Sequence, residues 1–423
     1  MTWRRAFAAC VGVLLTGFSV ALVHTQNPAS TEIRLDGEPT GVTKEQLKGV
    51  SFDCRPESLP ADRARVCRVA RRLEGQRLFD NETFGGNGRS CATCHPPETG
   101  TLSPADVQTR FAIFGFVDPL FRHDALDDGI SGVTRIRKHA TVRIELPLPP
   151  YVTLKDDPAR RTIVVLRAIP TTLNTPALDT VFMSDLRNDT LEEQALGAIV
   201  GHAKGTVAPT PVQLQLIAEF QRESPRFFSS PALRQFAKGG PAPELPLGET
   251  ESQRRGRLFF VEAPFKKGGK DGLCALCHSG PMLNTGSKTL SDAVPGAPVG
   301  IRDATVFVSE RNVIGNPVYS FVVEDVPGRQ VEVSSPDPGE ILIAKNLPPP
   351  SMFPRTTFMN FFKIPTLWGV KDTAPYFHDG SVKTLEELVD QYEFFFKDNP
   401  LGLITTFTEQ DKKDLVEYLK ILK

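Results

Sequence analysis

Two short clusters of cysteine and histidine carry the most specific chemical signal in the sequence. In each cluster two cysteines are separated by two residues and followed at once by a histidine: Cys91, Cys94 and His95 in the first, and Cys274, Cys277 and His278 in the second. Two thiols at this spacing can add to the two vinyl groups of one haem, and the neighbouring imidazole can bind the iron. The pattern therefore predicts two covalently bound c-type haems.

Two other kinds of site use similar residues. A structural zinc site would need four soft ligands close together, whereas a thioredoxin-like redox pair would not require a histidine in both copies. The repeated motif fits haem attachment better than either of these. Cys54 and Cys67 lie upstream of the first cluster. A disulfide between them is the simplest expectation in an oxidising compartment, and free structural thiols are the alternative.

The sequence around the two clusters is repeated. Arg77–Phe79 precedes the first cluster, and Arg257–Phe259 precedes the second. Downstream, an aspartate and a Thr-Leu-Glu-Glu run recur at identical spacing, as Asp185 with Thr190–Glu193 and as Asp379 with Thr384–Glu387. Each run has the pattern of a helix start capped by threonine, with glutamate three residues later. This repetition predicts two domains of one ancestral type.

The composition suits a soluble globular protein with buried cores. The 423 residues are 40% hydrophobic and 23% charged. We predict a mainly α fold of two cytochrome c-like haem domains related by internal duplication, with β-hairpin insertions. The predicted units are an N-terminal arm (26–69), the first haem domain (70–237), a linker rich in glycine and proline (238–248) and the second haem domain (249–423).

Two long segments interrupt the duplication, at about residues 108–165 and 286–356. Apolar and polar residues alternate over 141–146, over 318–323 and over 330–333, which predicts β-hairpins inserted into helical domains. The insertions either decorate the surface or shape the access to a haem or a docking face. The sequence does not choose between these roles.

The net charge and the N-terminus bear on partners and location. The 49 basic and 50 acidic residues leave a formal charge of −1, so no overall field favours nucleic acid or an anionic membrane. Arg4 and Arg5 precede an uncharged apolar stretch over residues 6–23. We therefore expect residues 1–25 to be a signal peptide or an N-terminal anchor, and the protein to be exported to the periplasm. Membrane contact is expected only if this segment stays uncleaved.

Three runs of the sequence resemble one known family. Arg77–Phe79 leads into the first cluster, Leu191–Ala195 follows the first aspartate turn, and Thr373–Glu387 surrounds the second aspartate turn. These runs resemble the bacterial dihaem cytochrome c peroxidase and MauG family from about residue 70 to the C-terminus. The resemblance implies an oxidoreductase that reacts with hydrogen peroxide.

The resemblance assigns iron ligands beyond His95 and His278. The peroxidases have a methionine at the position of Tyr392, and MauG resembles this chain in having tyrosine there. A hard phenolate oxygen favours oxidised iron, whereas a thioether favours the ferrous state. The alternative is that Tyr392 is a core aromatic residue on an amphipathic helix. Met352 and Met359 are fallback ligands, while Met282 is too close to His278 in sequence.

The first haem is expected to be the reactive one. Ala198 stands where the second half has Tyr392 and cannot bind iron, so the His95 haem is expected to have an open coordination site. The resemblance maps Glu193 onto the family's catalytic glutamate, which moves a proton during cleavage of the peroxide bond. The alternative role for Glu193 is to cap its helix together with Thr190.

The chain also departs from the family pattern. Phe182 replaces a glutamine, Leu186 replaces a glycine, and no tryptophan occupies the expected position between the haems. Trp368 is a candidate for electron hopping or, alternatively, a core residue.

Two further family features are assigned by resemblance. The peroxidases have a removable distal histidine, for which His123, His139 and His202 are the candidates, each with a surface histidine as the alternative. The family also binds calcium between its domains, and Thr373 and Pro375 stand at the matching positions.

The expected enzyme oxidises an external donor with hydrogen peroxide. That donor is a small cytochrome c or a cupredoxin, as for a peroxidase, or a protein side chain, as for MauG. The alternative from another functional class is a non-catalytic dihaem electron-transfer cytochrome with both irons six-coordinate.

Overall fold

The computed structural model describes residues 32–294, 299–399 and 402–423. The predicted signal segment (1–25) lies outside the described residues. Among the residues that are described, no helix combines the length and the apolar character needed to cross a membrane.

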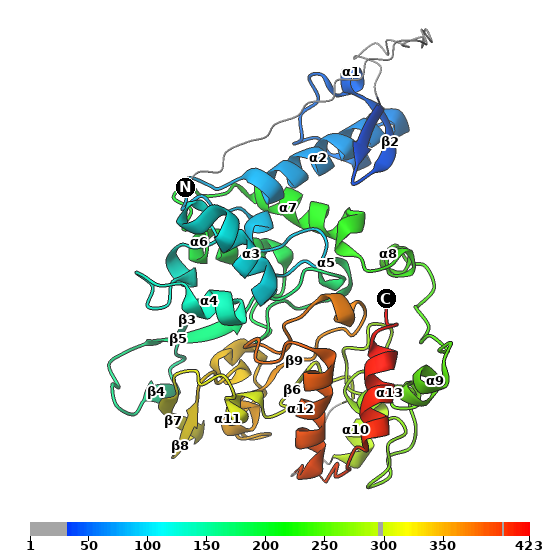
Figure 1. Cartoon of the computed structure of the whole chain (residues 1–423). Coiled ribbons are helices and arrows are strands. Elements are labelled where there is room, and N and C mark those ends of the chain that lie inside the picture. Colours follow the sequence, from blue (N-terminus) through cyan, green and yellow to red (C-terminus); the bar gives the residue numbers. More distant parts are fainter. Residues whose placement is uncertain (1–31, 295–298, 400–401) are drawn as a thin grey trace, which may run out of the picture.

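Helices dominate the described chain, and short strands join them (Figure 1). The helices of the first half are α1 (Lys44–Leu47), α2 (Ala61–Asn81), α3 (Pro104–Phe114), α4 (Thr134–His139), α5 (Thr175–Leu178), α6 (Leu191–Gly201), α7 (Pro211–Glu223) and α8 (Pro231–Ala237). Those of the second half are α9 (Glu251–Arg257), α10 (Lys288–Ala293), α11 (Val308–Arg311), α12 (Leu385–Lys397) and α13 (Glu409–Leu419). The strands are β1 (Glu32–Leu35), β2 (Glu38–Thr43), β3 (Thr141–Pro147), β4 (Val152–Leu154), β5 (Thr162–Ala168), β6 (Asp303–Ala304), β7 (Tyr319–Val326), β8 (Arg329–Ser335) and β9 (Phe362–Lys363).

The predicted linker lies between α8 and α9, where the chain forms neither helix nor strand. Helix α2, which leads towards the first cluster, begins at Ala61 and so extends upstream of the domain boundary predicted at residue 70.

A pair of crossing helices recurs in both halves. Helix α2 crosses α7 in the first half, and α9 crosses α13 in the second. Each crossing has a glycine at its closest point, because a Cβ atom at Gly75 would collide with the Leu216 carbonyl and one at Gly256 with the Asp414 carbonyl. The absence of a side chain thus permits the close approach.

The crossing helices revise the alignment of the two halves by one residue. The Phe79 ring packs against Phe220, with centroids 5.8 Å apart, and the Phe260 ring packs against Tyr418 at 5.3 Å. Each aromatic residue follows its crossing glycine by four positions. The residue that corresponds to Phe79 in the structure is therefore Phe260, whereas the sequence comparison pairs it with Phe259.

The two insertions form strands that pack together. Strands β3 and β5 pair in antiparallel register, and β7 and β8 form a hairpin. Strand β4 of the first insertion pairs with β7 of the second, with Val152 opposite Val323, so that one three-stranded sheet contains both segments. Buried residues of both insertions also share one hydrophobic cluster. The insertions therefore join the two halves of the chain.

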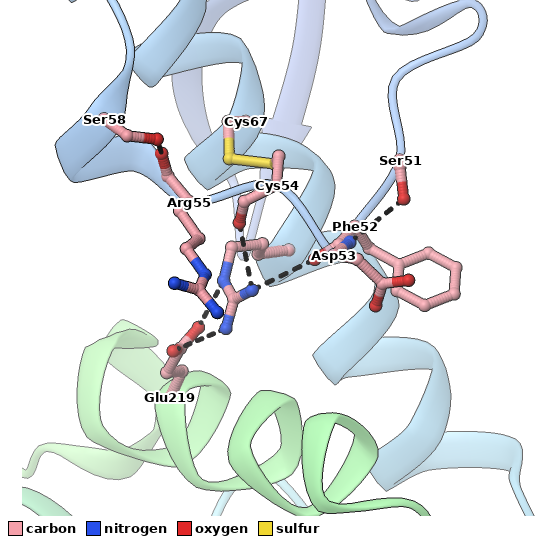
Figure 2. Close-up of a disulfide and its surroundings, with 9 residues drawn as sticks. Ser51, Phe52, Asp53, Cys54, Arg55, Ser58, Cys67 and Glu219 are labelled. Atoms are coloured by element: carbon pink, nitrogen blue, oxygen red, sulfur yellow. Dashed lines mark hydrogen bonds and ion pairs between the residues drawn. A yellow bond between two sulfur atoms is a disulfide. The ribbon is translucent and has the colours of Figure 1, made fainter.

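A disulfide holds the N-terminal arm, as predicted (Figure 2). Cys54 is bonded to Cys67 of α2, with Cα atoms 6.0 Å apart. Beside it the buried Arg71 guanidinium donates to the Glu219 carboxylate on α7, at 2.7 and 2.9 Å, and to the carbonyl oxygens of Phe52 and Cys54. The arm is thus fastened to the two helices that cross in the first half.

Candidate functional site

One cavity contains both cysteine–histidine clusters. Its volume is about 390 Å³, and its lining comes from both halves of the chain and is mainly apolar. The six cluster residues all line it: Cys91, Cys94, His95, Cys274, Cys277 and His278. The four cysteines carry free thiols. A large apolar cavity with a few polar groups is typical of a cofactor site.

Backbone carbonyls orient the two cluster histidines in the same way. His95 Nδ1 lies 2.7 Å from the Gly100 carbonyl oxygen, and His278 Nδ1 lies 2.8 Å from that of Leu283. A carbonyl oxygen can only accept, so Nδ1 carries the hydrogen and Nε2 keeps its lone pair. This is the arrangement found in metal-binding histidines, where the second ring nitrogen is held by a hydrogen bond.

Burial keeps the cluster side chains uncharged. It lowers the pKa of His278 to about 4 and also lowers the pKa of His95. It raises the pKa of the Cys91 and Cys277 thiols to about 12. Near neutral pH the imidazoles are therefore unprotonated and the thiols neutral, as an apolar surrounding requires.

Tyr392 faces the second histidine from the opposite wall. It lies on α12, and its hydroxyl oxygen is 3.4 Å from His278 Nε2. Its ring packs near Phe377 and Phe396, and burial raises the pKa of its phenol. Tyr392 thus packs among core aromatic residues, and its hydroxyl points at His278.

Helix α6 has the geometry of α12 without the tyrosine. Thr190 and Thr384 cap the two helices through their side-chain oxygens. Ala198 lines the cavity at the place in α6 that Tyr392 has in α12, seven residues after the first residue of the helix. The methyl group of Ala198 leaves space on the His95 side of the cavity.

Glu193 lies outside the cavity. It is exposed, its backbone N–H donates to Thr190, and its carboxylate accepts from the Asp189 N–H at 3.0 Å. Glu387 makes the same bond to Lys383 at the start of α12. The second glutamate of each Thr-Leu-Glu-Glu run thus accepts a backbone hydrogen bond at the start of its helix, and Glu193 is not part of the cavity lining. The catalytic role expected for Glu193 stays a prediction.

Of the three candidate distal histidines, His202 alone lines the cavity. His123 is exposed, and His139 is half-buried away from the lining. His202 follows the last turn of α6, and its Nδ1 lies 2.5 Å from an Asp124 carboxylate oxygen. The sequence contains no local signal for this pair, because Asp124 belongs to the first insertion.

The fallback ligands lie outside the lining of the cavity. Met352 is 67% exposed, Met282 is buried in the core of the second half, and Met359 packs against the cluster formed by the insertions. Trp368 is a buried core residue whose indole N–H donates to the Pro281 carbonyl at 2.8 Å. Met183, which the sequence analysis did not single out, does line the cavity.

The first and second aspartate turns have the same backbone shape at two matching positions. Met183 and Leu186 have φ values of 71° and 58°, and the corresponding Phe377 and Gly380 of the second turn both have 65°. Leu186 thus adopts a left-handed conformation that glycine adopts more readily.

A buried ion-pair network lies beside the cavity. Arg167 on β5 donates to Asp185 at 2.5 Å and to Asp337 at 2.7 and 2.9 Å. Arg187 donates to Asp185 at 2.9 Å. Both arginines line the cavity. The network joins the two halves, and Arg167 and Asp337 are too far apart in sequence to be paired from spacing alone.

Thr373 and Pro375 both line the cavity. The Thr373 hydroxyl donates to the Val370 carbonyl. Within the described ranges, no group of three or more histidine, cysteine, aspartate or glutamate side chains could hold a metal ion.

Comparisons with known proteins give a partial sequence match and similarities to solved structures. No family model matches the sequence. The cytochrome-c peroxidase IdrP2 of Denitromonas iodatirespirans is 29% identical over 180 residues, which cover 41% of this chain and 40% of the length of that protein. Among solved structures, a MauG-like protein associated with microbial copper homeostasis has a TM-score of 0.46 at 18% identity, over 83% of this chain and 89% of its own. The diheme peroxidase BthA from Burkholderia thailandensis has 0.41 at 17%, over 93% and 94%.

Proposed function

We propose that this chain is an exported dihaem oxidoreductase of the cytochrome c peroxidase and MauG kind, which reacts with hydrogen peroxide and oxidises an external donor. The observation that carries the proposal is the single cavity lined by both cysteine–histidine clusters. The partial sequence match to a cytochrome-c peroxidase supports it.

The residues present fit two c-type haems. Each cluster offers two free thiols for the vinyl groups and one neutral histidine with an available Nε2. Arg187 at the cavity wall uses one guanidinium nitrogen for Asp185 and can also pair with a propionate carboxylate. When bound, the haems would supply iron that exchanges electrons with peroxide and with the donor.

The residues opposite His95 and His278 differ, and this difference gives the two sites different roles. Tyr392 closes the His278 side, where its hydroxyl faces the imidazole. Ala198 leaves the His95 side open for a small molecule such as hydrogen peroxide. The first site therefore binds the substrate, and the second stores or passes oxidising equivalents.

The overall reaction requires two electrons and two protons for each hydrogen peroxide, which yields two molecules of water. Two molecules of a one-electron donor, such as a small cytochrome c or a cupredoxin, would supply the electrons. Alternatively they come from the side chain of a protein substrate, as in a MauG-like enzyme.

We also propose a calcium ion held by backbone carbonyls near Thr373 and Pro375, to be tested by metal analysis before and after chelation.

The test begins with the haem content of the matured protein. Mass spectrometry of the chain, produced in a bacterial host that attaches c-type haem, is expected to show the mass of two porphyrins. Replacing Cys91 and Cys94 by alanine, or Cys274 and Cys277 by alanine, is expected to remove one haem each. The absence of Soret absorption, or one porphyrin in the parent chain, contradicts the proposal.

Peroxide then tests the activity. Stoichiometric hydrogen peroxide is expected to change the ferric spectrum of the parent protein, and turnover with reduced cytochrome c identifies a peroxidase rather than a protein-modifying enzyme. Two low-spin haems that are inert to peroxide would identify an electron carrier instead.

A further inference from the structure

We infer that His202, oriented by Asp124, is the side chain that moves the proton when hydrogen peroxide is cleaved on the His95 side of the cavity. This inference rests on the proposed function and names a residue that takes the role that the resemblance gives to Glu193.

The position of His202 follows from the two equivalent helices. His202 is the C-cap of α6, and its N–H donates to the Ala198 carbonyl four residues earlier at 2.9 Å. Both residues are therefore on the same side of the helix, and both line the cavity. The corresponding pair of α12 is Tyr392 and Phe396, whose ring centroids are 6.3 Å apart. Tyr392 directly faces His278, so a side chain one helical turn further along lies to the side of the direction from the helix to the histidine. His202 is therefore placed beside a molecule held opposite His95, in the position of a proton acceptor rather than of an iron ligand.

Asp124 determines which ring nitrogen of His202 faces the cavity. Asp124 is 4% exposed and lies 2.5 Å from the Arg89 guanidinium as well as 2.5 Å from His202 Nδ1. Burial alone would raise the pKa of Asp124, but the His202 hydrogen bond and the Arg89 charge outweigh burial and lower it. The ionised carboxylate can only accept, so the hydrogen is on Nδ1 and the lone pair is on Nε2.

The Nε2 atom is available. It makes no hydrogen bond with the described part of the chain, while Nδ1 is fixed by Asp124. Histidine held by a carboxylate in this way is an established arrangement for a general base, because the carboxylate fixes the tautomer and stabilises the imidazolium that forms.

The other polar side chains near this part of the cavity are less suited. Gln194 lines the cavity but does not titrate. Glu82 lines it as well, but its carboxylate is paired with Arg77 at 2.8 Å and accepts from the Phe84 N–H. Glu193 faces away from the cavity.

The proton transfer is a balanced step. Nε2 accepts the proton from the peroxide oxygen that faces His95 and returns it to the outer oxygen. The O–O bond breaks, its electron pair leaves with the outer oxygen, and that oxygen departs as water. The two electrons and two further protons that convert the remaining oxygen to a second water come from the external donor and the solvent.

The experiment compares His202→Gln and Asp124→Asn with the parent protein, each carrying two haems by mass. His202→Gln is expected to slow the reaction with peroxide by about a hundredfold or more, and Asp124→Asn by about tenfold to a hundredfold. Cyanide binding to the ferric protein provides a readout that needs no turnover. Hydrogen cyanide must lose its proton to bind as the anion, so both variants are expected to bind it more slowly.

His123→Asn is the matched control, because His123 is exposed, precedes Asp124 and has a φ of 48° that asparagine tolerates. Its peroxide and cyanide rates are expected to equal those of the parent. Unchanged rates in His202→Gln overturn the inference, as does a change of its resting ferric spectrum from low to high spin, which would make His202 an iron ligand. The inference is also overturned if Glu193→Gln reacts slowly with peroxide while His202→Gln reacts at the rate of the parent. A parent protein that binds cyanide but ignores peroxide contradicts the proposed function alone.

Discussion

At the scale of single residues, chemical role follows from what holds each polar atom. Carbonyl oxygens bind Nδ1 of both cluster histidines, and a carboxylate binds Nδ1 of His202. In each case the other ring nitrogen is left with a lone pair. The same residue type thus keeps a free ring nitrogen in both places, which suits the proposed iron binding in the clusters and the proposed proton transfer beside them.

Tyr392→Phe tests the second ligand. The variant keeps the ring packing and removes only the hydroxyl that faces His278. We expect two haems as in the parent protein, but a ferric spectrum in which the second haem has lost a ligand. Tyr418→Phe is the control, since that hydroxyl donates to the Pro246 carbonyl outside the cavity. Identical ferric spectra for Tyr392→Phe and the parent would exclude the tyrosine as a ligand.

At the scale of elements, short covalent and ionic links fasten segments that have little core of their own. The arm before α2 has one small hydrophobic cluster, built from strands β1 and β2 and from residues of α2. The disulfide and the Arg71–Glu219 pair add to it.

Replacing Cys54 and Cys67 by serine removes the disulfide. Closing a loop of this size limits the unfolded chain and is worth about 3 kcal/mol. We expect a lower free energy of unfolding in denaturant under oxidising conditions, with an unchanged haem spectrum because the arm is outside the cavity. Equal stability of variant and parent would show that the arm unfolds independently of the haem domains.

Glu340, in the short 3₁₀ helix Glu340–Leu342, is expected to make the stability of the protein depend on pH. Burial and the neighbouring negative charge of Asp303 raise the pKa of Glu340 to about 9. The folded chain thus holds this proton more tightly than the unfolded chain, whose glutamate titrates near about 4.3. The stability that Glu340 contributes is fully present below about pH 4.3, and it is lost as the pH rises towards about 9.

Glu340→Gln removes this titration. We expect the melting temperature of the variant minus that of the parent to be larger at about pH 9 than at about pH 5. Parallel melting curves of the two proteins across this range would mean that Glu340 is ionised in the folded state.

At the scale of the whole molecule, segments far apart in sequence join the two halves around the cavity. The β4–β7 pairing links the insertions, and Arg167 links Asp185 of the first half to Asp337 of the second. Arg167, Asp185 and Asp337 are nearly inaccessible to solvent. The network therefore positions the walls of the cavity relative to one another.

Arg167→Met leaves the buried Asp337 carboxylate without its arginine and leaves Asp185 paired with Arg187. Loss of one partner of a buried ionic network costs about 3–5 kcal/mol, so we expect a much lower free energy of unfolding. Arg254→Met is the control, because the side chains of Arg254 and its partner Glu251 are 48% and 77% exposed, where the loss is about 1 kcal/mol or less. Comparable losses in the two variants would contradict a special role for the buried network.

The sequence by itself determined the features that depend on neighbours in the chain. The two cysteine–histidine clusters, the threonine caps of α6 and α12, the alternation that becomes β3, β7 and β8, and the Cys54–Cys67 pair are all patterns of short range. In each of them spacing alone limits which groups can meet, so the pattern predicts the local structure.

Only the tertiary structure decided which side chains share the cavity. A helix start with Thr190 and Glu193 reads equally well as a cap or as a catalytic site, and the rotation of α6 turns Glu193 outward and His202 inward. Asp124 reaches His202, and Arg167 reaches Asp337, only because the chain folds back between them. Such contacts depend on the packing of distant segments, for which spacing along the chain provides no measure.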